Sequence, residues 1–95
     1  MDAKNLQPRF LQIDDYQNGF LNLLDQLTDI GKISEEQFKE TLNSSNAPQT
    51  YVIQDQITNQ IIATASLLVE HKFIHSCGKV GHIEDVVVDK NSRGL

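Results

Sequence analysis

The ten-residue run IIATASLLVE, from Ile61 to Glu70, constrains the fold of this chain more than any other segment. Apolar side chains occupy both of its alternating faces, which is typical of a long strand covered on both sides. A shorter apolar run from Tyr51 to Ile53 precedes it, and the polar segment DQITNQ, residues 55–60, separates the two. The sequence therefore predicts a β-hairpin whose second strand is long and needs protein on both faces.

A first helix is predicted before this hairpin, over about residues 15–28. Asp14 and Gln17 form a capping pair at its start, and Gly31 marks the region of its end. Apolar side chains recur within it at the spacing of one helix face. They are Phe20, Leu23, Leu24 and Leu27.

A second helix is predicted to begin after Ser34, where S-E-E-Q is a capping box with two acids in the first turn. A short strand at about residues 10–13 precedes both helices, the histidine-rich link 71–79 follows the hairpin, and a last strand runs over residues 80–89. The order is β-α-α-β-β-β, and 95 residues suffice for one small domain. We therefore predict an α+β fold, a mixed sheet with helices packed on it.

Charge and cysteine content limit the partners and the compartment. The net charge of −5 disfavours nucleic acid and anionic membranes, since both require a basic surface. The apolar runs are shorter than a bilayer span, and residues 1–10 have no apolar signal core. The single cysteine, Cys77, fits a reducing compartment. We expect a cytoplasmic protein with no membrane span.

Two acids, Glu84 and Asp85, interrupt the last predicted strand, GHIEDVVVD, residues 81–89. On a regular strand Glu84 would share a face with Val86 and Val88 while Asp85 would point to the opposite side. In a strand covered on both faces at least one of these carboxylates would be desolvated, which makes it a candidate acid, base or polar anchor. Alternatively, the strand lies at a sheet edge and both acids meet water. A bulge would change which side chain faces where.

The pattern around these acids is distinctive. E-x-K-x-I-H begins at Glu70, G-H-I-E-D-V-V-V begins at Gly81, and R-G follows at residues 93–94. Together they resemble the glucosamine 6-phosphate N-acetyltransferases, a family of the GNAT acetyltransferase superfamily. Residues 27–38 and 61–79 are similar to the same family, so the resemblance spans nearly the whole chain. It implies a GNAT fold and the transfer of an acetyl group from acetyl-CoA to the amine of glucosamine 6-phosphate, a step toward UDP-N-acetylglucosamine.

The resemblance also implies roles for individual residues. Those for the sugar substrate are Thr28, Lys72, Phe73, Ile74, His75, Glu84, Asp85 and Val86. Those for acetyl-CoA are Val86, Val87, Val88, Arg93, Gly94 and Leu95. Direct attack of an amine on a thioester needs alignment, a route for the proton and an oxyanion donor, but no covalent nucleophile. Glu84 and Asp85 would then orient the sugar hydroxyls or the amine and help to accept the proton, and a backbone amide near Val86 would be the donor to the oxyanion.

A basic patch is predicted in the histidine-rich link. Lys72 and His75, together with His71 and Lys79, suit a sugar phosphate on an otherwise acidic protein. The alternative is an ordinary solvated loop, because conspicuous surface charges often have no functional role.

The same link contains zinc-type ligands, His71, His75 and Cys77, with His82 close by. No C-x-x-C pair or H-E-x-x-H helix spaces them for a metal, so no metal is expected. Cys77 has no identified activating partner and is not expected to act as a nucleophile.

The sequence departs from the family pattern at its end. The family's coenzyme loop continues with further glycines, whereas this sequence stops at Leu95, where the family has a polar residue. We therefore expect residues 1–95 to be the N-terminal portion of a single N-acetyltransferase domain, truncated within the pyrophosphate loop, with part of its last strand left exposed.

Three functional interpretations remain open at this point. The first is the glucosamine-phosphate acetyltransferase, which the resemblance implies to be a homodimer when full length. The second is an acetyltransferase for another amine. The third is a non-catalytic fragment that binds sugar phosphate or pairs with a full-length subunit.

Overall fold

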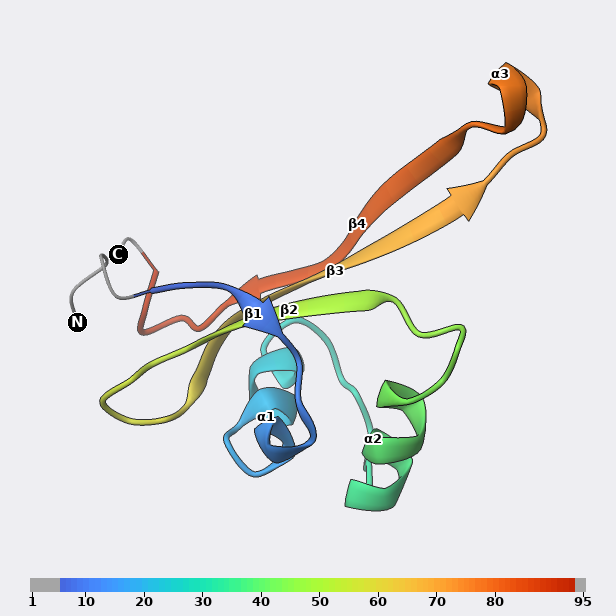
Figure 1. The fold of residues 1–95 in the computed structure, drawn as a ribbon. Helices are drawn as coiled ribbons and strands as arrows, with labels where there is room; N and C mark the ends of the chain where they lie inside the picture. The colour runs from blue at the N-terminus through green and yellow to red at the C-terminus, as the bar shows by residue number, and fades with distance from the viewer. Residues whose placement is uncertain (1–5, 94–95) are drawn as a thin grey trace.

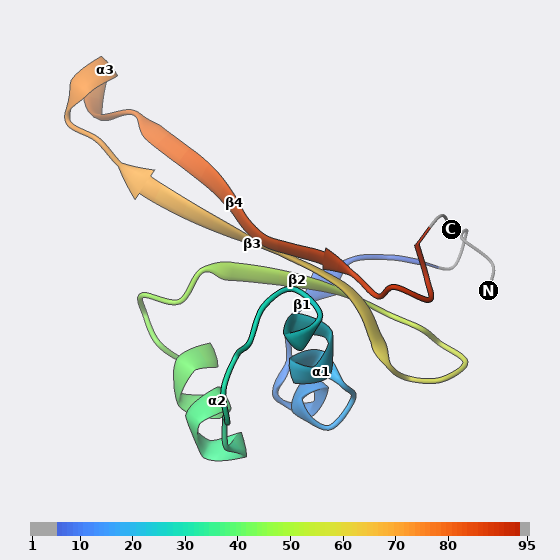
Figure 2. The same ribbon diagram turned by 180° about the vertical axis from the view of Figure 1, so that it is seen from behind.

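Figure 1 shows the computed structural model of the protein, which describes residues 6–93. The elements in chain order are β1 (Arg9–Phe10), η2 (Ile13–Tyr16), α1 (Phe20–Asp25), α2 (Glu35–Leu42), β2 (Gln49–Gln54), β3 (Ile61–His71), α3 (Ile74–Cys77) and β4 (Lys79–Val88). The predicted order β-α-α-β-β-β is confirmed, with the single turns η2 and α3 added to it. Both α1 and α2 lie on the same side of the sheet (Figures 1 and 2).

The strands form one sheet in the order β1-β2-β3-β4, and each pairs antiparallel with the next. The mixed sheet expected from the sequence is therefore antiparallel throughout residues 6–93, because short links join β2 to β3 and β3 to β4. Asp55 organises the first of these links. Its carboxylate accepts from the backbone N–H of Ile57 at 2.9 Å, and its own N–H donates to the carbonyl of Gln60 at 2.9 Å.

The first helix is shorter than the predicted 15–28. A 3-10 turn, η2, comes first, and Gly19 then separates it from α1 with a left-handed φ of 86°. Glycine adopts this left-handed conformation at little free-energy cost, and a left-handed residue interrupts a right-handed helix. At the start of η2 the backbone N–H of Gln12 donates to the Asp15 carboxylate at 2.8 Å, so the capping interaction predicted at Asp14 is displaced by two residues.

The second helix agrees with its capping signal. The Gln37 backbone N–H donates to Ser34 Oγ at 3.1 Å, and the Ser34 N–H donates to Gln37 Oε1 at 2.8 Å. These reciprocal bonds satisfy two amides that the first turn would leave unpaired. The helix presents Phe38 to the ring of Phe20 at a centroid distance of 5.8 Å.

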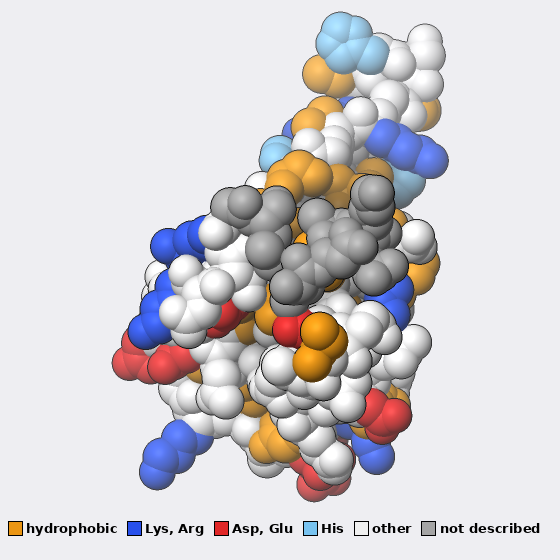
Figure 3. Space-filling view, turned by 90° about the vertical axis from the view of Figure 1, so that its left-hand side faces the viewer, with side chains coloured by type: hydrophobic (Ala, Val, Ile, Leu, Met, Phe, Trp, Pro, Cys, Tyr) orange, Lys and Arg blue, Asp and Glu red, His pale blue; other side chains and the backbone are white. Residues whose placement is uncertain are grey.

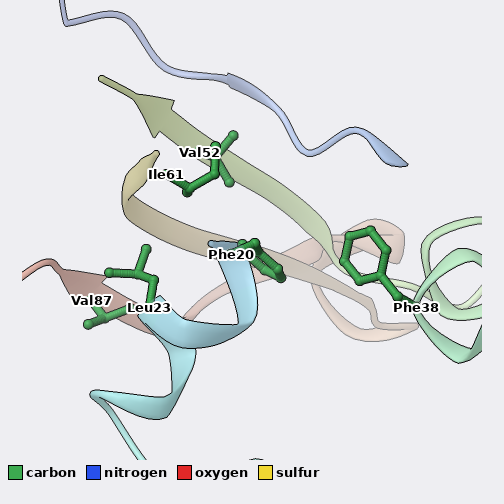
Figure 4. Close-up of a cluster of buried hydrophobic side chains, with 6 residues drawn as sticks. All are labelled: Phe20, Leu23, Phe38, Val52, Ile61 and Val87. Carbon is green, nitrogen blue, oxygen red and sulfur yellow. The ribbon is translucent and has the colours of Figure 1, made fainter. Parts of the chain in front are cut away.

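The core lies between the helices and the sheet (Figure 4). Its buried members are Phe20 and Leu23 of α1, Phe38 of α2, Val52 of β2, Ile61 of β3 and Val87 of β4. Each such side chain contributes about 1.5–3 kcal/mol when it leaves water. Val87 is the member that ties β4 to this core, so the anchored part of β4 is its C-terminal end.

The β3–β4 hairpin extends beyond the rest of the molecule (Figures 1 and 3). β2 pairs with β3 only as far as Leu67, after which β3 and β4 pair with each other alone. We call residues 68–82 the projecting half, and residues 61–67 with 83–88 the inner half. Phe73, at the end of the projecting half, is 95% exposed. On β4, the last strand, the exposed apolar side chains are Val80 in the projecting half and Ile83, Val86 and Val88 in the inner half.

Candidate active site

The acidic pair of β4 lies at a β-bulge. Thr64 of β3 pairs with Val87, but Ser66, two residues further along β3, pairs with Glu84. β4 therefore contains one extra residue over this interval, and Asp85 adopts a left-handed φ of 52°. Aspartate is one of the few residues that enter this region at modest cost.

The bulge reverses the alternation of side chains along β4. On its C-terminal side, Val87 is buried in the core, while Val86 and Val88 line a shallow cavity on the opposite, helix-free face. On its N-terminal side, Glu84 pairs with Ser66. Directly paired residues share a face, so the register puts Glu84 on the helix side.

Asp85 faces the same side, because it lines a cavity between the sheet and the two helices. The arrangement expected for a regular strand, with Glu84 on the face of Val86 and Val88 and the two acids on opposite sides, is therefore not present, and the alternative of a bulge is the one that the register shows. The physical reason is the extra residue, which shifts the phase of alternation. Both acids are exposed, as the alternative of an edge strand predicted, because β4 lies at one of the two edges of the sheet within residues 6–93.

The cavity beside Asp85 has a volume of about 220 Å³ and a mostly apolar wall from α1 and α2. Its sheet side carries hydroxyl groups that are hydrogen-bonded within the protein: Thr50 and Ser66 share a bond of 2.8 Å, and Thr64 Oγ1 donates to the Tyr51 carbonyl at 2.8 Å. Among the residues that line this cavity in the described part of the chain, Asp85 alone is charged. A polar ligand entering here would therefore meet one carboxylate at the rim of an apolar wall.

Next to Val86 and Val88, the edge of β4 that faces away from β3 has no neighbouring strand within residues 6–93. The Asp89 backbone N–H donates to the Ile62 carbonyl of β3 at 2.7 Å. N–H and C=O groups alternate in direction along an antiparallel strand, so those of Val86 and Val88 point away from β3. In agreement, Arg93 Nε donates to the outward carbonyl of Val88 at 3.0 Å. No other strand within residues 6–93 covers this edge.

The remaining predicted residues near this end have different positions. Thr28 is exposed just beyond α1, where its N–H donates to the Leu24 carbonyl at 3.2 Å, and it does not line the cavity. Arg93 lies next to the open edge, as its bond to Val88 indicates. Gly94 and Leu95 lie outside the described residues.

The residues predicted to hold the sugar phosphate form the end of the projecting half. The Lys72 N–H donates to the Gly78 carbonyl at 2.9 Å, which closes the loop. Phe73 and Ile74 are directed to solvent, with 95% and 66% of their surface exposed. The loop therefore presents two large apolar side chains beside the Lys72 ammonium group.

This loop has an unusual backbone. Three consecutive residues, His75, Ser76 and Cys77, have φ between 54° and 63°. Left-handed conformations cost roughly 1–2 kcal/mol per residue for L-amino acids. Such strained positions gather where a protein fixes a functional geometry.

Glu70 lies at the base of this loop and was not among the predicted residues. Its carboxylate accepts from Lys72 Nζ at 2.8 Å and contacts His82 Nε2 at 3.0 Å. The Lys72 hydrogen bond, followed by the one with His82, lowers the pKa of Glu70 from its ordinary 4.5. The predicted basic patch therefore contains a carboxylate, which partly neutralises Lys72.

The structure does not bring this loop to the acids of the same chain. From Lys79, where β4 begins, five residues of regular pairing lead to Glu84. At about 3.3 Å per residue this separates the two regions by roughly 17 Å, which is longer than a single sugar phosphate. The backbone of the loop therefore lies farther from Glu84 than one sugar phosphate extends, although the Lys72 ammonium group reaches back to Glu70.

Sequence reasoning also missed the hydroxyl groups of the cavity wall, Thr64 and Ser66. The available signal was their spacing. Two polar residues two positions apart in an apolar strand share one face, and both are buried. For Glu70 the signal was its position in E-x-K, since residues two apart on one strand also share a face.

Residues 6–93 contain no group of three histidine, cysteine or acidic side chains placed to hold a metal ion. Within the same residues, every helix falls short of the length and apolarity that crossing a bilayer requires.

Comparison with known proteins agrees with the fold and the sequence pattern. No protein-family model matches the chain. It is 41% identical over 96 residues to glucosamine 6-phosphate N-acetyltransferase of Arabidopsis thaliana, a match that covers 97% of this chain and 64% of the relative. It is 49% identical over 90 residues to glucosamine 6-phosphate N-acetyltransferase 1 of Dictyostelium discoideum, covering 90% of this chain and 57% of the relative.

Solved structures give the same result. The crystal structure of the Arabidopsis thaliana enzyme matches with a TM-score of 0.84 and 40% identity, over 95% of this chain and 64% of that one. A Trypanosoma brucei acetyltransferase matches with a TM-score of 0.84 and 34% identity, over 96% and 65%. The chain spans about three fifths of the length of these relatives. Over the length that it spans, the chain has a GNAT acetyltransferase fold and is related in sequence and structure to the glucosamine 6-phosphate N-acetyltransferases.

Proposed function

We propose that the chain serves an enzyme that transfers an acetyl group from acetyl-CoA to the amine of D-glucosamine 6-phosphate, giving N-acetyl-D-glucosamine 6-phosphate for UDP-N-acetylglucosamine biosynthesis. One observation carries this proposal. The bulge turns Asp85 toward a cavity while the neighbouring valines keep an open strand edge. An acetyltransferase needs two such surfaces side by side, one for each substrate. The names of the relatives support the choice of substrates.

The acceptor side of this site consists of Glu84, Asp85 and the cavity. Asp85, on the rim of an apolar wall, orients the amine and accepts its proton. Glu84, on the same side by register, holds sugar hydroxyl groups. Thr28 contributes a further sugar contact from the segment beyond α1.

The coenzyme side is the open edge of β4. Acetyl-CoA supplies the acetyl group as a thioester. The outward N–H and C=O groups of Val86 and Val88 suit an extended amide-bearing arm, which can pair with them as an added strand does. The Val86 N–H is then directed to the oxygen that gains negative charge during transfer. Arg93, followed by the backbone of Gly94 and Leu95, is assigned to the pyrophosphate.

The projecting half serves the acceptor site of a second subunit. The backbone of Phe73, Ile74 and His75 lies beyond the start of β4, roughly 17 Å or more from Glu84 along the strand, too far to share one sugar phosphate with it. In a symmetric dimer each loop reaches the site of the other subunit. The exposed apolar side chains of the loop give such a contact its buried area. A homodimer is therefore part of the proposal.

A cytoplasmic location is also part of the proposal. Cys77, the only cysteine of the sequence, is exposed. Free thiols on a surface persist in reducing compartments.

Amide substitutions test the role of the acids. Asp85→Asn should lower the turnover of acetyl transfer to glucosamine 6-phosphate by roughly 10²–10⁴-fold, because an amide cannot accept the proton. Glu84→Gln should chiefly raise KM for the sugar. Release of coenzyme A thiol measures both, with Glu40→Gln on the exposed face of α2 as the matched control. Normal turnover in both acid variants would contradict the proposal, and a panel of other amines tests the choice of acceptor.

Complementation tests the shared site. Lys72→Ala and Asp85→Asn should each be impaired alone. Mixed after unfolding and refolding together, they form heterodimers in which one site has both native residues, which should restore about a quarter of the wild-type activity for a symmetric dimer. If no activity returns although heterodimers form, the loop does not serve its partner's site.

A further inference from the structure

Gln26, at the C-terminal end of α1, contacts the segment that leaves β4. Its side-chain Nε2 donates to Asp89 Oδ1 at 2.7 Å, and its Oε1 accepts from the Lys90 backbone N–H at 3.0 Å. One amide side chain thus uses its donor and its acceptor on two consecutive residues that are more than sixty positions away in the sequence. We call these two hydrogen bonds the Gln26 clamp.

The clamp acts on a residue that already organises the turn after β4. Asp89 Oδ2 accepts from the Asn91 N–H at 3.0 Å, and the Asp89 carbonyl accepts from the Ser92 N–H at 2.9 Å. The Gln26 hydrogen bond is the largest cause of the lowered pKa of Asp89, against partial burial, which raises it. The carboxylate therefore has one oxygen on α1 and the other on the turn.

The turn leads directly to Arg93, whose Nε returns to the Val88 carbonyl at 3.0 Å. The direction of this segment is thus set at its start by Gln26 and at its end by the edge of β4. The clamp also forms part of the wall of a second cavity of about 310 Å³, lined by polar residues such as Asn22, Thr58 and Ser92.

We propose that Gln26 is a positioning residue for acetyl-CoA, which holds the exit of β4 in the conformation that the coenzyme's phosphates require. The inference rests on the proposed function. A surface turn that is ordered before the ligand arrives loses less conformational freedom on binding. Gln26 itself touches no substrate; it acts through Asp89 and Lys90.

Charge and hydrogen-bonding capacity make the clamp specific for an amide. Gln26→Glu keeps the acceptor for the Lys90 N–H, but it removes the donor to Asp89 and places a second carboxylate against it. Adding Asp89→Asn supplies a side-chain N–H at position 89, which can donate to the new carboxylate at position 26. The double variant Gln26→Glu with Asp89→Asn therefore reverses the direction of one hydrogen bond and keeps both contacts.

The experiment compares wild type, Gln26→Glu, Asp89→Asn and the double variant in the full chain. Gln26→Glu should accelerate amide hydrogen exchange at Lys90 and Asn91 and weaken coenzyme A binding, measured by calorimetry, by roughly three- to tenfold. KM for acetyl-CoA should rise while kcat and KM for the sugar stay close to wild type. The double variant should recover both exchange protection and affinity. Gln17→Glu, a charge change at an exposed glutamine outside the clamp, should alter none of these.

Two results would overturn the inference. One is unchanged exchange at Lys90 and Asn91 in Gln26→Glu, since Gln26 would then not hold the segment. The other is unchanged coenzyme affinity in that variant while the wild type binds coenzyme A. A wild-type chain that binds no coenzyme A would instead count against the proposed function, and the exchange data would still decide whether Gln26 holds the turn.

Discussion

The two halves of the β3–β4 hairpin have similar side chains but different surroundings. On the β3 strand of the inner half, Ile61 and Ile62 are 3% and 7% exposed, next to α1 and the neighbouring strand. In the projecting half, Leu68 and Val69 are 39% and 38% exposed, because β3 has no partner but β4 there. Burial in this chain is therefore decided by which elements lie across from a residue, more than by the residue type.

The bulge lies within the inner half, close to its boundary with the projecting half. Asp85 there lines the helix-side cavity, and the strand that continues past it loses its neighbours within a few residues. A bulge bends a strand and increases its local twist. The candidate site thus lies close to the point where the β3–β4 hairpin extends beyond β2.

The largest effect should come from truncating a core side chain beneath the inner half. Leu23 is 2% exposed, so Leu23→Ala should lower the free energy of unfolding by about 2–5 kcal/mol. Leu68→Ala in the projecting half is the matched variant and should change it by about 0.5 kcal/mol or less. Chemical denaturation followed by circular dichroism measures both. A loss at Leu68 as large as that at Leu23 would show that Leu68 is covered in solution, as by the partner subunit of the proposed homodimer, and would break the comparison made within one chain.

Some of this could be predicted from local sequence alone. The capping box at Ser34 and the polar connection at residues 55–60 depend on neighbouring residues, and both agree with the structure. The first helix was predicted too long, because helical spacing of apolar residues outweighed the interruption at Gly19. The extent of the domain and the roles of the site residues stay predictions.

The side of the sheet on which each acid lies depends on a bulge, and a bulge depends on how β4 pairs with β3. Apolar alternation along β4 contains no information about that pairing. The clamp from Gln26 to Asp89 is likewise a contact between distant segments. Such features require the tertiary structure, whereas the acidic pair itself was evident from its unusual place among valines.

A moderate effect should follow from changing the bulge residue. Asp85 has a φ of 52°, where a β-branched side chain is strained and glycine is not. Asp85→Val should therefore be less stable than Asp85→Gly by roughly 1–2 kcal/mol. At Val80, in the regular part of β4, the order should reverse, with Val80→Gly less stable than the wild type by roughly 0.5–1 kcal/mol. Thermal unfolding measures both pairs. If valine is more stable than glycine at position 85 as well as at position 80, the bulge is not retained in solution.

The smallest effect concerns the charges that hold the projecting half, at Glu70. Hydrogen bonds from Lys72 and His82 lower the pKa of this carboxyl below its ordinary 4.5. A carboxyl whose pKa is lower in the folded state stabilises that state above its unfolded pKa, and the contribution is lost as the pH falls through the folded pKa. Glu70→Gln should therefore unfold more easily than wild type near about pH 6, and the difference should shrink as the pH is lowered through and below 4.5. Glu36→Gln on α2 is the control. A difference that stays constant as the pH is lowered well below 4.5 would mean that ionised Glu70 does not hold the base of the loop, and that the projecting half depends on something other than these charges.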